Sequence, residues 1–307
     1  MILEKVVIGK KYPLDGLLTI PDTGNEPYPA VVLVHGSGAH DMDEKIYKIR
    51  PFKDIAEGLA KHGIASIRYN MRTLTYGKQI IKEMSKDLTV KEEKIEDAVY
   101  AADLLRQDAR IDSNKIFIAG HSLGGCLAPR IDVEGGDFAG LIIMAGSPRR
   151  LEDIIIDQGT AQVDALKGPL KWIAKKQIAK IHAKLDDIYS KTDEEAKAIS
   201  FLGNTSLYYL KDMGQKTVAD YLADSTKPIL VMHPEKDVQV LLDKDFGKYK
   251  EILADHPNAT FKLYKGLNHA FMPSLYGTID KALKEFKTEQ HVDEQVIADM
   301  ADWMKSI

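Results

Sequence analysis

Serine, aspartate and histidine occur in this sequence at positions where strands are expected to end. Ser122 stands between Gly120 and Gly124 in the run GHSLG, which matches the pattern G-x-S-x-G. Asp237 lies in PEKDVQV and His269 in LNHAF, so the chain order is Ser, Asp, His. A serine hydroxyl becomes a nucleophile when a histidine takes its proton, and a carboxylate holds that imidazole in one tautomer. The three residues together indicate nucleophilic acyl transfer.

The two glycines fit a sharp turn between a strand and a helix. Apolar residues precede the motif in KIFIAG and follow it in LGGCLAP. Glycine at both flanking positions avoids side-chain collisions with the adjoining strand and helix, and the serine then projects at the helix N-terminus. There the backbone N–H groups and the helix dipole favour a developing negative charge. A tight turn needs no chemistry, however, so a purely structural Ser122 is the alternative.

Backbone donors for an oxyanion are expected at two places. The run HGSG follows the apolar segment AVVLV, and its glycines let a backbone N–H approach a substrate carbonyl. The second donor belongs to the residue after the nucleophile. We assign the two donors to the amides of Ser37 and Leu123. An ordinary turn at Ser37 and Gly38 is the alternative.

Other residues compete for some of these roles. If the register slips, Asp243 or Asp245 would replace Asp237 as the acid. Cys126 lies on the helix after Ser122 without an evident base, so it is interpreted as a small buried apolar residue. The histidines lack metal-ligand spacing and no HExxH motif occurs. We therefore expect no metal and no cofactor.

Strand and helix patterns alternate around the candidate residues. Residues 2–9 and 14–21 predict two antiparallel strands. Amphipathic patterns predict helices over 51–63, from Thr89 through Leu105, and over 291–307. Continuous apolar runs predict buried strands at 30–36, 115–121, 140–146, 227–233 and 259–266, and residues 64–70 predict a further strand. The alternation predicts an α/β fold with a mostly parallel central sheet flanked by helices on both faces.

Residues 151–225 interrupt this alternation. A crossover helix takes about 10–15 residues, and this interval is several times longer. Apolar residues recur at helical spacing from Leu170 to Ile188, and Thr192 with Glu195 predicts another helix start. We expect a helical cap inserted between two sheet strands, over a catalytic core formed by residues 1–150 and 226–307. Tyr208 and Tyr209, at the end of the cap, are candidates for the wall of an acyl pocket, and a place in the core of the cap is the alternative.

Composition excludes several classes of function. The chain has 307 residues, of which 44% are hydrophobic and 29% charged, and a formal net charge of −4 with both signs interspersed. It has no basic patch for nucleic acid and no apolar stretch long enough to cross a bilayer. A single cysteine excludes an internal disulfide, and with an N-terminus that lacks a signal pattern it favours the cytoplasm. For the oligomeric state, the sequence is compatible with a monomer and with a homodimer.

These runs in combination resemble the α/β-hydrolase superfamily. VVLVHGSG, GHSLGGCLAPR, KPILVMHPEKDVQV and LYKGLNHAF carry the resemblance, which spans nearly the whole chain outside the cap. Within the superfamily, the chain looks like bacterial esterases and dienelactone-hydrolase-like or acyl-peptidase-like hydrolases with a helical cap. The resemblance implies a nucleophile elbow at Ser122 and a catalytic triad. Two departures are Asn70, where such proteins more often have aspartate, and Pro234, where glycine is usual.

The sequence thus predicts a serine hydrolase that cleaves carboxylic esters of small-to-medium acyl groups through an acyl-enzyme. Its expected partner is a small-molecule ester, with neither nucleic acid nor membrane involved. The same groups would suit a thioester, an aryl amide or a short peptide, so a thioesterase or a peptidase-like amidase stays open. A hydrolase-fold binding protein without turnover is an alternative of another class.

Overall fold

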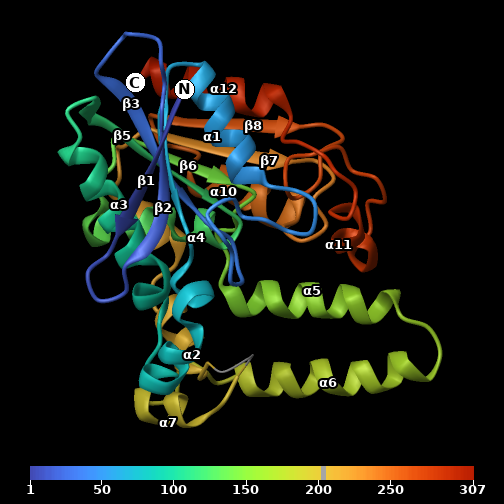
Figure 1. The fold of residues 1–307 in the computed structure, drawn as a ribbon. Coiled ribbons are helices and arrows are strands. Elements are labelled where there is room, and N and C mark those ends of the chain that lie inside the picture. The colour runs from blue at the N-terminus through green and yellow to red at the C-terminus, as the bar shows by residue number, and fades with distance from the viewer. Residues whose placement is uncertain (202–204) are drawn as a thin grey trace.

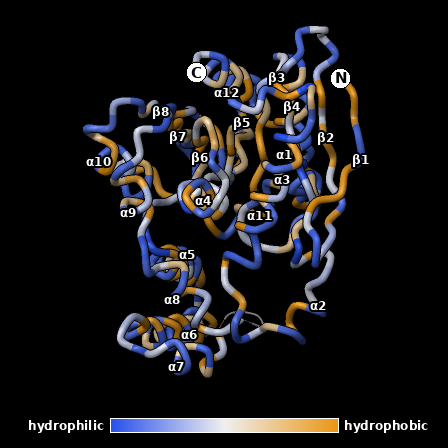
Figure 2. Tube along the Cα trace, turned by 90° about the vertical axis from the view of Figure 1, so that its left-hand side faces the viewer, coloured by the Kyte–Doolittle hydropathy of each residue, from blue (hydrophilic) through white to orange (hydrophobic). Residues whose placement is uncertain are grey.

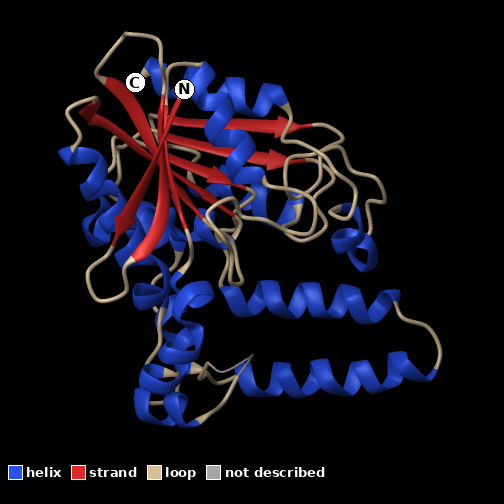
Figure 3. Ribbon diagram, viewed as in Figure 1, coloured by secondary structure: helices blue, strands red, loops and turns tan. Residues whose placement is uncertain are grey.

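The computed structural model describes residues 1–201 and 205–307. Within them, an eight-stranded sheet has the order β1-β2-β4-β3-β5-β6-β7-β8 (Figure 3). The first two strands form the predicted antiparallel hairpin, β2 is antiparallel to β4, and all later pairs are parallel. The strands are β1 (Ile2–Ile8), β2 (Leu14–Ile20), β3 (Tyr28–Val34), β4 (Ala65–Tyr69), β5 (Ile111–His121), β6 (Leu141–Met144), β7 (Ile229–Pro234) and β8 (Ala259–Tyr264). The predicted α/β fold is confirmed.

The central strands are apolar because helices cover both of their faces. β3, β6 and β7 are buried along nearly their whole length, and the strands stand out as apolar stretches in Figure 2. β8 departs from the prediction of a buried strand. It lies at the edge of the sheet, where Leu263 is 43% exposed, because an edge strand has a neighbour on one side only.

Two helical layers enclose the sheet. α1 (Pro51–Lys61) and α12 (Glu294–Ser306) pack on one face, and α3 (Glu96–Gln107) and α4 (Leu123–Ile131) pack on the other. The predicted helix start near Thr89 is a turn of π-helix over Lys91–Ile95 that continues into α3, and the Thr89 N–H donates to Glu92. The sequence patterns did not indicate α2. The remaining helices of the core are α2 (Arg72–Met84), α10 (Gly247–Ile252) and α11 (Ala282–Glu285).

Five helices lie between β6 and β7 in the described part of the chain, where the insertion was predicted. They are α5 (Leu151–Ala165), α6 (Pro169–Leu185), α7 (Asp193–Ala198), α8 (Tyr208–Gly214) and α9 (Val218–Leu222). α5 and α6 run side by side as a hairpin on one side of the sheet (Figure 1). The predicted capping box of Thr192 and Glu195 opens α7. The apolar spacing of α6 does form a helix, but Leu170 and Ile173 on it are at least half exposed.

Parallel strands bring their carboxyl ends to one edge of the sheet. β5 ends at His121, β7 at Pro234 and β8 at Tyr264. Each of the three candidate catalytic residues follows one of these ends within a few positions, so the fold collects them there. Among the described residues, no helix combines the length and apolarity needed to cross a membrane.

Candidate active site

Ser122 occupies a turn that only glycine neighbours permit. Its φ of 54° lies in the left-handed region, between the end of β5 and the start of α4. A Cβ on Gly120 would lie 2.1 Å from the Gly124 carbonyl oxygen, and a Cβ on Gly124 would lie 2.2 Å from that of Val34. The Ser122 N–H donates to the Met144 carbonyl at 2.8 Å, which ties the turn to β6. The backbone therefore requires both glycines and holds the serine in a strained conformation.

Asp237 and His269 form a buried pair. His269 Nδ1 lies 2.6 Å from Asp237 Oδ2. The other carboxylate oxygen accepts the N–H groups of Gln239 at 2.8 Å and Val240 at 3.0 Å. Burial raises the pKa of Asp237, but the charge and hydrogen bond of His269 and the Val240 amide outweigh it, so the pKa falls below its ordinary value. An ionised, fixed carboxylate thus faces Nδ1 of the imidazole.

The alternative acids are engaged elsewhere or exposed. Asp245 is buried and accepts hydrogen bonds from Ser147 Oγ at 2.6 Å and from Arg149 Nε at 2.7 Å. Asp243 lies in the same π-helical turn, Leu242–Phe246, and is exposed. Of the three aspartates considered from the sequence, Asp237 is the one that contacts His269.

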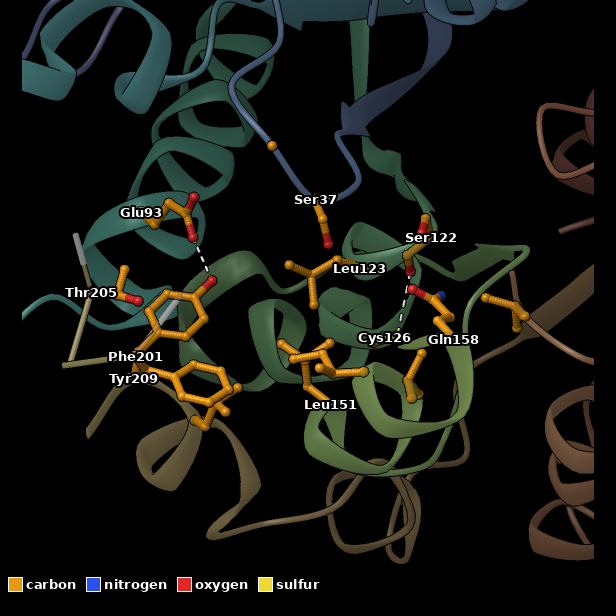
Figure 4. Close-up of a pocket in the computed structure, with 15 residues that line it drawn as sticks. Ser37, Glu93, Ser122, Leu123, Cys126, Leu151, Gln158, Phe201, Thr205 and Tyr209 are labelled. Carbon is orange, nitrogen blue, oxygen red and sulfur yellow. Dashed lines mark hydrogen bonds between the residues drawn. The ribbon is translucent and has the colours of Figure 1, made fainter. Parts of the chain in front are cut away.

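The loop after β3 passes directly beside the nucleophile candidate. A Cβ on Gly36 would lie 3.1 Å from Ser122 Cβ. Ser37 and Leu123, the residues assigned as oxyanion donors, line the same cavity as Ser122 (Figure 4). The two segments that were expected to supply donors therefore meet at Ser122.

The cavity at Ser122 has a volume of about 510 Å³. Its walls are mostly apolar, and the insertion contributes Leu151, Ile154 and Ile155 on α5 and Tyr209 on α8. Tyr208 is not among its lining residues; its ring lies 4.9 Å from the Lys197 ammonium instead. Neighbouring residues of a helix point in directions about 100° apart, so one tyrosine faces the cavity and the other does not. We therefore keep Tyr209 as a pocket residue and correct the assignment of Tyr208.

Glu44 is a site residue that the sequence patterns did not reveal. It is 1% exposed, and its Oε1 accepts the Gly36 N–H at 2.8 Å. Its Oε2 lies 2.9 Å from His121 Nδ1, and His121 Nε2 donates to the His269 carbonyl at 3.0 Å. Lys94 Nζ donates to the Gly36 carbonyl at 2.8 Å. This network joins the loop after β3 to the backbone of His269. The acidic run DMDE was the available signal, but spacing does not tell which acid turns inward.

Glu44 and His121 each favour the charged form of the other. Burial raises the pKa of Glu44, but the charge and contact of His121 have a larger opposite effect, and the pKa falls to about 2. Burial lowers the pKa of His121, and the charge and contact of Glu44 outweigh this and raise it. A buried ion pair of this kind is costly to break, since one partner is left uncompensated.

Replacing Glu44 with glutamine is expected to lower the free energy of unfolding at pH 7 by about 3–5 kcal/mol. Because the folded-state pKa of Glu44 is below its ordinary 4.5, its stabilisation is complete above about pH 4.5 and is lost as the pH falls toward 2. The stability gap between wild type and Glu44→Gln should therefore narrow below pH 4.5. Urea unfolding at pH 7 and pH 3.5 measures both quantities.

The exposed pair of His291 and Asp54, 3.1 Å apart, provides the control. His291 is largely exposed, so His291→Gln should cost less than about 1 kcal/mol at either pH. If Glu44→Gln cost no more than this control, the Glu44 pair would not support the site.

Cys126 and His35 lie near the site, but burial favours the uncharged form of both side chains. Burial raises the pKa of the Cys126 thiol to about 12, and its Sγ donates to the Ser122 carbonyl at 3.3 Å. Burial lowers the pKa of His35 to about 3, and its Nε2 donates to the Asp41 carbonyl at 3.0 Å. A neutral thiol is a poor nucleophile. Within the described ranges, no group of three or more His, Cys, Asp or Glu residues is placed to hold a metal ion.

Comparisons with known proteins agree with the fold. The sequence profile described as "Alpha/beta hydrolase family" matches residues 31–276. Esterase EstD of Thermotoga maritima is 33% identical over 292 residues, which are 95% of this chain and 65% of that protein, so the chain spans just under two thirds of this relative.

Solved structures show the same fold at low identity. Est1E from Butyrivibrio proteoclasticus superimposes with a TM-score of 0.60 at 16% identity and covers 99% of both chains. A proline iminopeptidase of Mycobacterium smegmatis has a TM-score of 0.59 at 14% identity, over 99% of this chain and 98% of that one. Because a peptidase is among these neighbours, the fold alone does not decide the reaction.

Proposed function

Because this chain belongs to the alpha/beta hydrolase family, we propose that it is a serine esterase that cleaves carboxylic esters of small-to-medium acyl groups. The main support is the strained turn of Ser122 at a cavity, in a fold that also pairs Asp237 with His269. Likeness to a relative named as an esterase adds to it. We further propose that residues 151–225 act as a cap over a core of 1–150 and 226–307.

The proposed reaction has two halves. Ser122 Oγ attacks the acyl carbon, and its proton passes to Nε2 of His269. The bond from the acyl carbon to the alcohol oxygen then breaks, and His269 returns the proton to the departing alkoxide. Water, deprotonated by the same histidine, attacks the acyl carbon of the acyl-enzyme. The bond from that carbon to Ser122 Oγ breaks, His269 returns the proton to Oγ, and the acid is released. Asp237 orients His269 and stabilises its charged form without taking its proton.

The developing oxyanion would be held by the backbone N–H groups of Ser37 and Leu123. Preorganised donors act strongly in a site from which water is excluded. The N-terminus of α4, which begins at Leu123, adds a favourable partial charge. Glu44 and Lys94 hold the N–H and the carbonyl of Gly36, so they would keep the Ser37 loop in place.

The cavity favours neutral substrates of limited size. Its walls from α5 and α8 are mainly apolar, and its volume of about 510 Å³ is that of a pocket for small molecules. An ester with a small-to-medium neutral or aromatic acyl group is the proposed substrate, and we propose no partner beyond it. We also propose a cytoplasmic location, since Cys126, the one cysteine, is a free thiol.

A p-nitrophenyl ester series from acetate to palmitate is expected to show kcat/KM rising over a few carbons and then collapsing. Each buried CH₂ contributes about 0.8 kcal/mol until the pocket ends. Tyr209→Ala should move the cutoff to longer acyl chains, because its ring lines the cavity. Tyr208→Ala is the matched control, one residue away and outside the lining, and should leave the cutoff where it is.

A labelling experiment separates an enzyme from a binding protein. A fluorophosphonate probe should label the wild-type protein, since a pure binder need not activate its serine. A flat profile that extends to palmitate and does not respond to Tyr209→Ala would contradict the pocket assignment. Faster cleavage of matched thioesters or anilides than of esters would contradict the ester assignment.

A further inference from the structure

Glu93 is an acidic side chain in the lining of the proposed acyl cavity. Among the described residues that form this lining, it is the one with a carboxylate. Figure 4 shows Glu93, Thr205 and Tyr209 grouped at one end of the cavity and Ser122 at the other, with Leu123 and Leu151 between them. The cavity therefore has a polar end that apolar walls separate from the nucleophile.

Tyr209 holds Glu93 in this position. Its hydroxyl, from α8 of the insertion, donates to Glu93 Oε2, and Glu93 precedes α3 of the core. A carboxylate has about four acceptor positions on its two oxygens, so one phenol does not exhaust its capacity. A substrate group that enters the cavity with a hydrogen-bond donor at its far end would meet an acceptor that is already oriented.

We propose that the enzyme prefers esters whose acyl group carries a hydroxyl at its far end, which Glu93 accepts as a hydrogen bond. This inference rests on the proposed serine esterase function. The acyl half is favoured over the alcohol half because the leaving alcohol takes its proton from His269. His269 is not among the described lining residues of the cavity that leads to Glu93.

A neutral hydroxyl suits this site better than an ammonium group. The charge of Lys94, the next residue, already interacts with Glu93, and Lys94 is fixed by its bond to the Gly36 carbonyl. A second cation would have to lose its hydration in a partly buried site where the charge of Lys94 is already present, which is unfavourable. A hydroxyl loses little hydration and regains one hydrogen bond.

The size of the preference follows from the Tyr209 contact. A site with an unsatisfied polar group rejects an analogue that lacks the matching hydroxyl very strongly. Here Tyr209 continues to satisfy one oxygen of Glu93 when the substrate has none to offer. We therefore expect a kcat/KM ratio of about tenfold between hydroxyl and methyl forms of the same acyl chain.

The test uses p-nitrophenyl esters of ω-hydroxyacids of increasing length. Each is paired with the alkanoate that has a methyl group in place of the hydroxyl, and with the corresponding ω-ammonium ester. At the length that spans the cavity, the wild-type protein should cleave the hydroxyl form about tenfold faster than the methyl form. Glu93→Leu should bring this ratio to about one.

Asp212→Asn is the matched structural control. Asp212 lies on α8 like Tyr209, and its carboxylate pairs with Arg130 of the core at 3.0 Å, so it ties the same helix to the same core. Neither Asp212 nor Arg130 is among the lining residues. If Glu93 and Tyr209 only fastened the insertion to the core, Asp212→Asn would alter the ratio as Glu93→Leu does. Under our inference it leaves the ratio unchanged.

The outcomes distinguish this inference from the proposed function. Absence of ester cleavage and of fluorophosphonate labelling in the wild-type protein would overturn both. Cleavage of the alkanoates with a hydroxyl ratio near one at every length would overturn only the role of Glu93, as would a ratio that survives Glu93→Leu. Faster cleavage of the ω-ammonium esters than of the hydroxyl esters would overturn the choice of a neutral donor.

Discussion

Replacing Ser122 with alanine is expected to reduce turnover of activated esters by about 10⁴-fold or more. The substitution removes the attacking oxygen, and no neighbouring group is suited to replace it. Cys126 is nearby, but burial raises the pKa of its thiol to about 12, so a thiolate does not form at neutral pH. Steady-state rates on p-nitrophenyl acetate and butyrate, with the folded fraction taken from circular dichroism, measure the effect.

Stability should change little in this variant. The Ser122 hydroxyl borders the cavity, and the backbone bonds that fix the turn, from the Ser122 N–H to Met144 and from Cys126 to the Ser122 carbonyl, remain. Ser225→Ala is a suitable control, because Ser225 does not line the cavity. It should retain both turnover and fluorophosphonate labelling. Near-normal turnover by folded Ser122→Ala would remove the proposed mechanism.

The positions of the candidate catalytic residues were predictable because each follows a strand with a clear apolar pattern. Ser122 comes one residue after β5, Asp237 three residues after β7 and His269 five residues after β8. In a parallel sheet these strand ends meet at one edge. Correct strand predictions are therefore enough to predict that the Asp237–His269 pair and the Ser122 turn lie in the same region.

Side-chain direction within less regular segments was not predictable. Tyr208 and Tyr209 are adjacent and chemically alike, and the start of α8 decides which of them faces the cavity. Glu44 lies in a loop with a φ of 51°, and hydropathy does not indicate its burial. The apolar residues of α6 predicted a helix correctly but not its exposure, because that depends on how the α5–α6 hairpin meets the core.

Glu93 illustrates the same limit. The sequence places it in the first turn of the helix predicted from Thr89, where an acidic residue is ordinary. Its role becomes visible only when Tyr209, more than a hundred residues later, is brought against it. Contacts of such long sequence separation follow from how the insertion packs on the core, and neither segment carries a local pattern that specifies it.

Replacing His269 with alanine is expected to lower turnover as much as the loss of Ser122 does. Asp237→Asn should lower turnover somewhat less, by about 10⁴-fold. Alanine removes the base that accepts the serine proton. Asparagine at 237 keeps the shape but loses the charge that faces Nδ1 at 2.6 Å, and its amide can donate to Nδ1, which favours the wrong tautomer. Rates on p-nitrophenyl butyrate, corrected for the folded fraction, measure both changes.

Asp245→Asn provides a matched comparison for Asp237→Asn, since both aspartates are buried on the segment after β7. Asp245 binds Arg149 and Ser147 rather than the histidine, so its loss should lower the free energy of unfolding while turnover per folded molecule stays within about tenfold. The two variants therefore separate a catalytic charge from a structural one of the same chemistry. If Asp245→Asn abolished turnover and Asp237→Asn were harmless, the acid assignment would be wrong, and with it the proposed orientation of His269.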